Sequence, residues 1–162
     1  MNKKISVILT FFVALFVIFA MSCKTAPLTT REDTNAAFKA VYDEFRKNLV
    51  SDGAKSHTVA PGENLSIISK KYYGEDRGYY FPLIMLASSD IILDPDLIQP
   101  NMKLTIPDYK KNIEDAGSRA AMKSYFKEIA GVYKRKGNKT VEAKLLEISK
   151  NIAVLPKDSK AK

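Results

Sequence analysis

Hydrophobic and polar positions follow three different patterns along the chain. Residues 5–21 are almost wholly apolar. From Glu32 onward, apolar residues recur at the i, i+3, i+4, i+7 and i+11 spacing that is typical of one helix face, and residues 51–53 end that pattern with Gly53. The predicted buried face consists of Phe38, Val41, Tyr42, Phe45 and Leu49.

A helical pattern returns beyond Pro107, and residues 137–138 interrupt it. Thr140 is the predicted cap of the helix that follows. The first apolar stripe is Ile113, Ala116, Met122, Phe126, Ile129 and Tyr133, and the second is Val141, Leu145, Ile148 and Ile152. Because each amphipathic face needs a partner, we expect the N-terminal helix and the two C-terminal helices to pack on one another.

The central pattern, over residues 57–107, is shorter and mixed. Residues 58–60 predict a strand and residues 61–62 a turn. Pro82 suits the first turn of a second helix, where its missing N–H would be unpaired anyway. The first helix ends at Gly74 and carries Leu65, Ile68 and Tyr72 on one face. The second helix turns Leu83, Ile84 and Ala87 inward. In the closing strand, Leu104 and Ile106 point to the same face of the sheet, because side chains alternate between the two faces.

Four segments of this central region resemble a LysM domain in order and spacing. They are residues 57–65 (HTVAPGENL), 71–74 (KYYG), 94–100 (DPDLIQP) and 103–107 (KLTIP). The resemblance implies an α+β fold, a βααβ module with a two-stranded antiparallel sheet and two helices, here flanked by an N-terminal helix and a C-terminal helical pair. It also implies binding of N-acetylglucosamine-containing glycans such as peptidoglycan or chitin-like polymers, without catalysis.

In that family the glycan lies in a shallow groove between two loops. Carried over by position, the first loop is Gly62, Glu63, Asn64 and Leu65, and the second is Ala87, Ser88, Ser89, Asp90 and Ile91. The chain departs from the family pattern at Glu63-Asn64, at Ser88 and at Asn101, which stands where a glycine is common. Asn101 tolerates left-handed backbone geometry better than most residues. A module that folds without binding sugar remains an alternative.

The N-terminal residues 1–22 have the layout of a secretory signal, with Lys3 and Lys4 before the apolar run and Ser22 before Cys23, the only cysteine of the chain. This resembles the lipobox of bacterial lipoproteins in the relaxed, spirochaete-like form, since Ala20 replaces the usual larger apolar residue. The resemblance implies lipidation at Cys23. The alternative is a retained transmembrane anchor, although the run is slightly short of the roughly 20 residues required.

Either alternative places the rest of the chain in the cell envelope, tethered to a membrane and facing the periplasm. The expected organisation is a signal peptide over 1–22, a lipidated linker and helix over 23–56, the LysM-like module over 57–107 and a basic helical region over 108–162. An extended linker of eight residues would reach at most roughly 26 Å, and a helix over 32–50 would add roughly 28 Å.

Charge is concentrated at the C-terminal end of the chain, whose formal net charge is +8. Residues 57–107 hold four basic and six acidic residues, whereas residues 108–162 hold fourteen and seven. A solvated helical surface is the favoured interpretation of this basicity, with anionic lipid or acidic polymers as the other.

Residue types argue against an enzyme. A lipidated Cys23 leaves no thiol nucleophile, the single His57 cannot build a zinc peptidase, and the flanking helices lack nucleophile-elbow and phosphate-loop motifs. The carboxylates Glu75, Asp76, Asp90, Asp94 and Asp96 lie on separate loops and favour turns over a calcium site or a glycosidase pair. We expect no metal, cofactor or nucleic acid.

The sequence therefore favours a membrane-anchored lipoprotein that tethers the membrane to peptidoglycan. The rival hypothesis is an envelope scaffold or assembly adaptor that binds a partner protein through its helices. It predicts that Phe38, Phe45 and Phe126 form an exposed patch.

Overall fold

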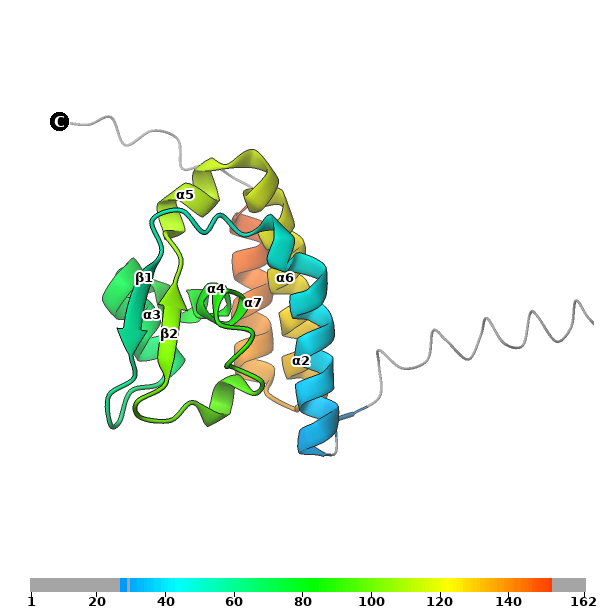
Figure 1. Ribbon diagram of the computed structural model, residues 1–162. Helices are drawn as coiled ribbons and strands as arrows, with labels where there is room; N and C mark the ends of the chain where they lie inside the picture. Colours follow the sequence, from blue (N-terminus) through cyan, green and yellow to red (C-terminus); the bar gives the residue numbers. More distant parts are fainter. Residues whose placement is uncertain (1–26, 29, 153–162) are drawn as a thin grey trace, which may run out of the picture.

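The computed structural model describes residues 27–28 and 30–152, and these form an α+β fold of helices around a two-stranded antiparallel sheet (Figure 1). The predicted fold class is correct at this level. In chain order the elements are α2 (Arg31–Phe45), η2 (Arg46–Asn48), β1 (Lys55–Thr58), α3 (Leu65–Tyr73), η3 (Glu75–Tyr80), α4 (Pro82–Ala87), η4 (Pro95–Leu97), β2 (Lys103–Ile106), α5 (Tyr109–Glu114), α6 (Ala116–Arg135) and α7 (Lys139–Asn151).

The sheet pairs β1 with β2, and His57 lies opposite Leu104. The predicted strand over 58–60 was placed too late, because β1 ends at Thr58. Pairing nevertheless continues past the strand: the Val59 N–H donates to the Met102 carbonyl at 2.9 Å, and the Val59 carbonyl accepts from the Asn101 N–H at 2.9 Å. Asn101 has a φ of +71°, so the left-handed geometry expected there is confirmed.

Helix α2 begins with a capping box that sequence reasoning did not identify. The Thr30 hydroxyl accepts from the Asp33 N–H, and the Asp33 carboxylate accepts from the Thr30 N–H. The predicted face of this helix is buried as far as Phe45, whereas Leu49 lies beyond the helix and is half-buried. The turn at Gly53, with φ +75°, follows the helix end and does not cap it.

The module's two helices follow the prediction with one correction. Leu65 and Ile68 of α3 are buried, but the aromatic residue buried with them is Tyr73, and Tyr72 is half-buried. Helical periodicity alone places Tyr72, at i+7 of Leu65, closer to that face than Tyr73, so the packing around α3 and not its period selects Tyr73 for burial. The core of α4 is Leu83, Ile84, Met85 and Leu86, while Ala87 is only partly covered.

The C-terminal region is divided differently from the prediction. Asp115 separates α5 from α6 and caps α6 by accepting from the Ser118 N–H at 2.6 Å, which leaves Ala116 exposed. The cap of α7 is Asn138 and not Thr140: the Asn138 side-chain oxygen accepts from the Val141 N–H at 3.1 Å. Thr140 lies exposed within the helix.

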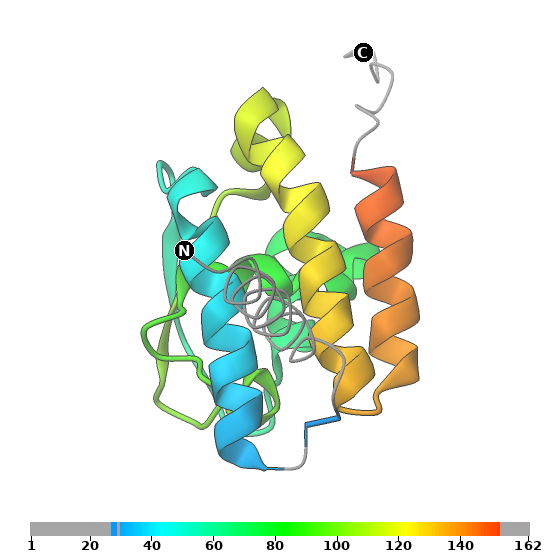
Figure 2. The same cartoon turned by 90° about the vertical axis from the view of Figure 1, so that its right-hand side faces the viewer.

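Helix α6 is the centre of the fold, with α2 packed on one side and α7 on another (Figure 2). This packing of the N-terminal helix with the C-terminal pair was expected. Tyr125 of α6 is fully buried, and its hydroxyl donates to the Pro82 carbonyl at the start of α4, at 2.8 Å. One hydrophobic core therefore joins the central module to its flanking helices.

Helix α2 lies alongside α6 and does not act as a spacer. The Leu28 N–H donates to the Arg135 carbonyl at 3.2 Å, which fixes the chain before α2 to the C-terminal end of α6. The expectation that this helix extends the reach of the linker is therefore wrong.

The α7 cap provides a stability test. Asn138→Ala removes the side-chain acceptor and should lower the free energy of unfolding by about 1 kcal/mol. Thr140→Ala, the matched control two residues away, should leave it unchanged or slightly higher, since alanine favours helix interiors. Thermal and urea unfolding measure both, and equal losses would contradict the assignment of the cap.

Candidate functional site

A surface hollow of about 410 Å³ lies where the turn after β1 meets the segment around η4. The rest of its wall comes from Tyr79 of η3, Phe81, Tyr133 of α6 and Val141 of α7. Its lining residues are Glu63, Asn64, Leu65, Ser66, Tyr79, Phe81, Pro95, Asp96, Ile98, Tyr133 and Val141. Three of the four predicted first-loop residues are among them.

The first loop is held by a glycine turn and a helix cap. Gly62 has a φ of +83°, and a Cβ there would meet nothing within 4 Å, so backbone conformation and not space requires the glycine. Asn64 caps α3 by accepting from the Ile67 N–H at 2.9 Å. Its oxygen is used in this cap, so the two N–H donors of the exposed Asn64 side chain are its remaining hydrogen-bonding groups at the hollow.

Glu63 is fixed by three groups. One carboxylate oxygen accepts from the Ala60 N–H at 2.8 Å and lies 2.7 Å from His57 Nε2, and the other lies 3.7 Å from Lys71 Nζ. The Ala60 hydrogen bond, followed by the one from His57, lowers the pKa of Glu63. His57 is buried, and its Nδ1 lies 3.2 Å from the Tyr72 hydroxyl. His57 therefore has a structural role, holding the first loop to β1 and α3 through Glu63 and Tyr72.

The opposite side of the hollow is held by Lys136, which follows α6. Its ammonium group lies 2.9 Å from Asp94 and 2.7 Å from Asp96. Burial opposes the charge of Lys136, but the Asp96 and Asp94 carboxylates outweigh it and raise the Lys136 pKa. The lysine also lies over the rings of Phe38 and Tyr133, 5.5 and 5.7 Å from their centroids. It therefore connects the segment around η4 to the end of α6.

The predicted second loop is located elsewhere. The buried Ser88 hydroxyl accepts from the Thr105 N–H at 2.8 Å, so it supports β2. Asp90 forms a two-pronged ion pair with Arg46, which directly follows α2. None of Ala87, Ser88, Ser89, Asp90 and Ile91 is among the residues that line the hollow. Their glycan contacts remain a prediction from resemblance.

The walls contributed by Tyr133 and Val141 were missed by sequence reasoning. In the sequence, both residues belong to apolar helix stripes, and such a stripe predicts burial without indicating a binding surface. Tyr79 also lines the hollow and is partly exposed, whereas Phe81 and Tyr133 are almost wholly buried. Phe81 and Tyr133 therefore serve mainly in packing, and Tyr79 is the aromatic ring of this wall that a ligand could reach.

Two further predictions concern the N-terminal segment and the acidic residues of the loops. Cys23 and the apolar run lie outside the described residues. Of the helices that the structure describes, none has both the length and the apolar character needed to cross a bilayer. The acidic residues once considered for calcium are separated: Asp90 pairs with Arg46, Asp76 with Arg77, and Asp94 and Asp96 with Lys136.

Comparisons with known proteins add little. No protein-family model matches the chain, and no solved structure matches it. A protein of Deinococcus radiodurans described as uncharacterized is 44% identical over 65 residues, which is 40% of this chain. The chain spans 24% of that protein's length. The match shows a shared segment and gives no activity.

Lys136 provides the second stability test. Lys136→Met keeps most of the side-chain volume but leaves Asp94 and Asp96 without their cation, and we expect a loss of about 2 kcal/mol in the free energy of unfolding. Lys134→Met, on the exposed side of α6, is the control and should cost little. Urea unfolding of both variants makes the comparison, and equal stabilities would show that the Lys136 pairs contribute nothing.

Glu63 provides a pH test. Because its folded pKa lies below the ordinary value of 4.5, its contribution is fully present above that pH and is lost as the pH falls through the folded pKa. Glu63→Gln should therefore be less stable than the parent at pH 6, with the difference shrinking below about pH 4. Urea unfolding at several pH values measures this. A difference that does not change with pH would contradict it.

Proposed function

We propose that this chain is a non-catalytic binder of N-acetylglucosamine-containing glycan, anchored to a membrane and attached to the peptidoglycan. One observation carries the proposal: the turn that the LysM resemblance assigns to sugar borders the 410 Å³ hollow. That volume lies within the roughly 300–1,000 Å³ typical of small-molecule sites.

The chemistry of the hollow suits an uncharged amide sugar. Asn64 offers amide donors, Ser66 is a partly exposed hydroxyl, and Tyr79 offers a ring face. Leu65 and Val141 are apolar contacts of the size needed for an acetamido methyl group. The two carboxylates, Glu63 and Asp96, are held in ion pairs, which favours positioned hydrogen-bond acceptors over acid–base chemistry.

The proposed anchor would strengthen weak binding. A single shallow site binds a sugar weakly, but a lipid on Cys23 would hold the site next to the wall polymer and raise its effective concentration. Two or more acyl chains are needed for stable anchoring, and a bacterial lipoprotein of the proposed type would carry them.

The scaffold hypothesis loses the residues on which it was based. Phe38, Phe45 and Phe126 are all buried, and they contact Tyr133, Tyr125 and Tyr80 respectively within the chain. A different observation keeps a partner surface as the second candidate. Three large exposed apolar residues follow α4 within a short stretch of the chain, namely Ile91, Leu93 and Leu97, and exposed apolar residues of this kind are the ones a partner protein would cover.

Retention on purified peptidoglycan sacculi tests the glycan proposal. Asn64→Asp keeps the cap of α3, because aspartate caps as well as asparagine, but it removes the NH₂ donor. Loss of a hydrogen bond in the site should weaken binding by about fivefold to tenfold. Asp90→Asn is the control on the predicted second loop and should bind like the parent.

Three outcomes separate the hypotheses. Weaker retention of Asn64→Asp alone, with unchanged thermal stability, supports the hollow. Weaker retention of Asp90→Asn alone would move the sugar to the second loop. Absence of retention by the parent chain, together with self-association or partner binding that Leu93→Ser abolishes, would favour the scaffold function.

A further inference from the structure

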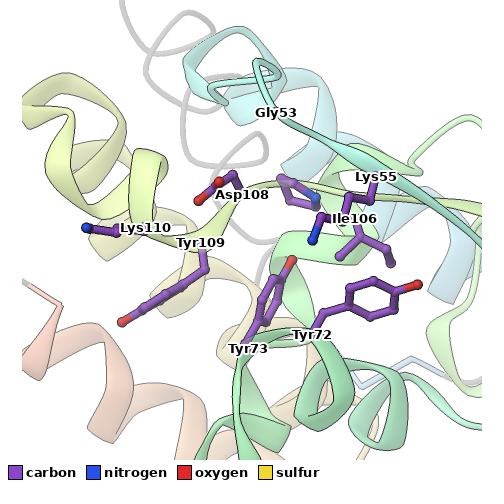
Figure 3. A pocket seen from close by; sticks show the side chains of 9 residues that line it. Gly53, Lys55, Tyr72, Tyr73, Ile106, Asp108, Tyr109 and Lys110 are labelled. Carbon is purple, nitrogen blue, oxygen red and sulfur yellow. The ribbon is translucent and has the colours of Figure 1, made fainter.

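A second cavity lies away from the proposed glycan site and shares none of its lining residues. It has a volume of about 190 Å³ and lies where β1, the end of β2, α3 and α5 meet (Figure 3). Its walls combine three tyrosine rings and two aliphatic residues with three charged side chains. The lining residues are Gly53, Lys55, Tyr72, Tyr73, Ile106, Pro107, Asp108, Tyr109 and Lys110.

Tyr73 directs an unused hydrogen-bond donor into this cavity. Its side chain is 8% exposed, and its buried hydroxyl has no hydrogen-bond partner among the described residues. Figure 3 shows that hydroxyl pointing to the space between Lys55 and Asp108. Burial and, secondarily, the Asp108 charge raise the pKa of Tyr73, so the phenol keeps its proton. A buried hydroxyl without a partner costs about 1–3 kcal/mol, which points to a ligand that accepts from it.

Lys55 brings a positive charge to the same space. Its side chain extends from β1 and lines the cavity (Figure 3). Among the described residues, none forms an ion pair with Lys55. The neighbouring lysines differ in this respect. Lys110 pairs with Glu114 at 3.6 Å, and Lys111 pairs with Asp52.

Asp108 limits what the cavity can accept. One of its carboxylate oxygens caps α5 by accepting from the Lys111 N–H at 3.1 Å. The Asp108 carboxylate also places a negative charge at one edge of the cavity. An inorganic phosphate, with four oxygens and up to two charges near neutral pH, would meet that charge and would find too few hydrogen-bond donors. A carboxylate has two oxygens and one charge, which match the Tyr73 hydroxyl and the Lys55 ammonium group.

We propose that this cavity is a binding site for the carboxylate group of a small organic acid or of a peptide end. Tyr73 and Lys55 hold the two oxygens, and the rings of Tyr72 and Tyr109 enclose the carbon part of the ligand. The site does not depend on glycan binding, since no residue is shared with the hollow at Glu63 and Asn64.

Ligand-observed NMR titration of the full chain tests this site. The probes are acetate, N-acetylglycine, the uncharged N-acetylglycinamide and inorganic phosphate. We expect saturable binding of one or both carboxylates and none of the amide. N-acetylglycine binding more tightly than acetate identifies a peptide end as the natural ligand, and the reverse order identifies a small free acid.

Variants connect the binding to the two donors. Tyr73→Phe removes only the hydroxyl and should weaken carboxylate binding by about tenfold or more, while its thermal stability stays equal or rises because a buried unpaired group is lost. Lys55→Gln should weaken binding similarly and should abolish its salt dependence. Lys110→Gln, at the rim of the same cavity with its charge paired elsewhere, is the matched control and should bind like the parent.

Three results would overturn the assignment. The first is absence of carboxylate binding by the parent chain. The second is phosphate binding as tight as carboxylate binding, which would indicate general anion attraction. The third is equal weakening by Lys110→Gln and Lys55→Gln. Should Tyr73→Phe fail to fold, Lys55→Gln alone decides between these outcomes.

Discussion

A two-stranded sheet cannot bury enough apolar surface to be stable in water without a cover. Helix α4 packs on β2, and helix α6 contacts the start of α4. Tyr125 is fully buried at this contact, and its hydroxyl donates to the Pro82 carbonyl at 2.8 Å. Phe126 on the same helix contacts Tyr80 of η3. Because the module and the flanking helices share this core, we expect them to unfold together as one cooperative unit.

The same dependence shapes the proposed glycan site. The turn at Asn64 would border only an open surface if Tyr133 and Val141 did not stand opposite it. The position of the facing segment depends in turn on Lys136, whose charge lies between Asp94 and Asp96. The site therefore belongs to the whole described chain, even though its recognisable sequence pattern covers only residues 57–107.

The elements that were predicted well are those with a strong local pattern. The face of α2 through Phe45, the glycine turn at Gly62 and the left-handed Asn101 all follow from spacing or from intrinsic backbone preference. The misplaced features depended on tertiary contacts. Tyr72 and Tyr73 are equally apolar neighbours, and only the packing of α3 on the core selects Tyr73 for burial.

Site residues were predicted less well than the fold for a similar reason. Three of the four residues of the predicted first loop border a hollow, and the turn and the Asn64 cap that position them are encoded within a few residues. Their sugar contacts stay a prediction. The residues across from it, Pro95, Ile98 and Tyr133, come from distant parts of the chain. Spacing along the sequence cannot reveal that they meet. The cavity at Tyr73 was equally invisible, because an unpaired hydroxyl is a property of three-dimensional surroundings.

The hydrogen bond from Leu28 to Arg135 has a consequence for the proposed attachment to the membrane. The chain enters the fold beside Lys136, and hence beside Asp96 at the edge of the 410 Å³ hollow. Only four residue steps separate Cys23 from Pro27, and these span at most about 14 Å. If Cys23 is acylated as proposed, the end of the fold that carries this hollow would therefore lie close to the lipid headgroups, while the opposite end of α6 would point away from them.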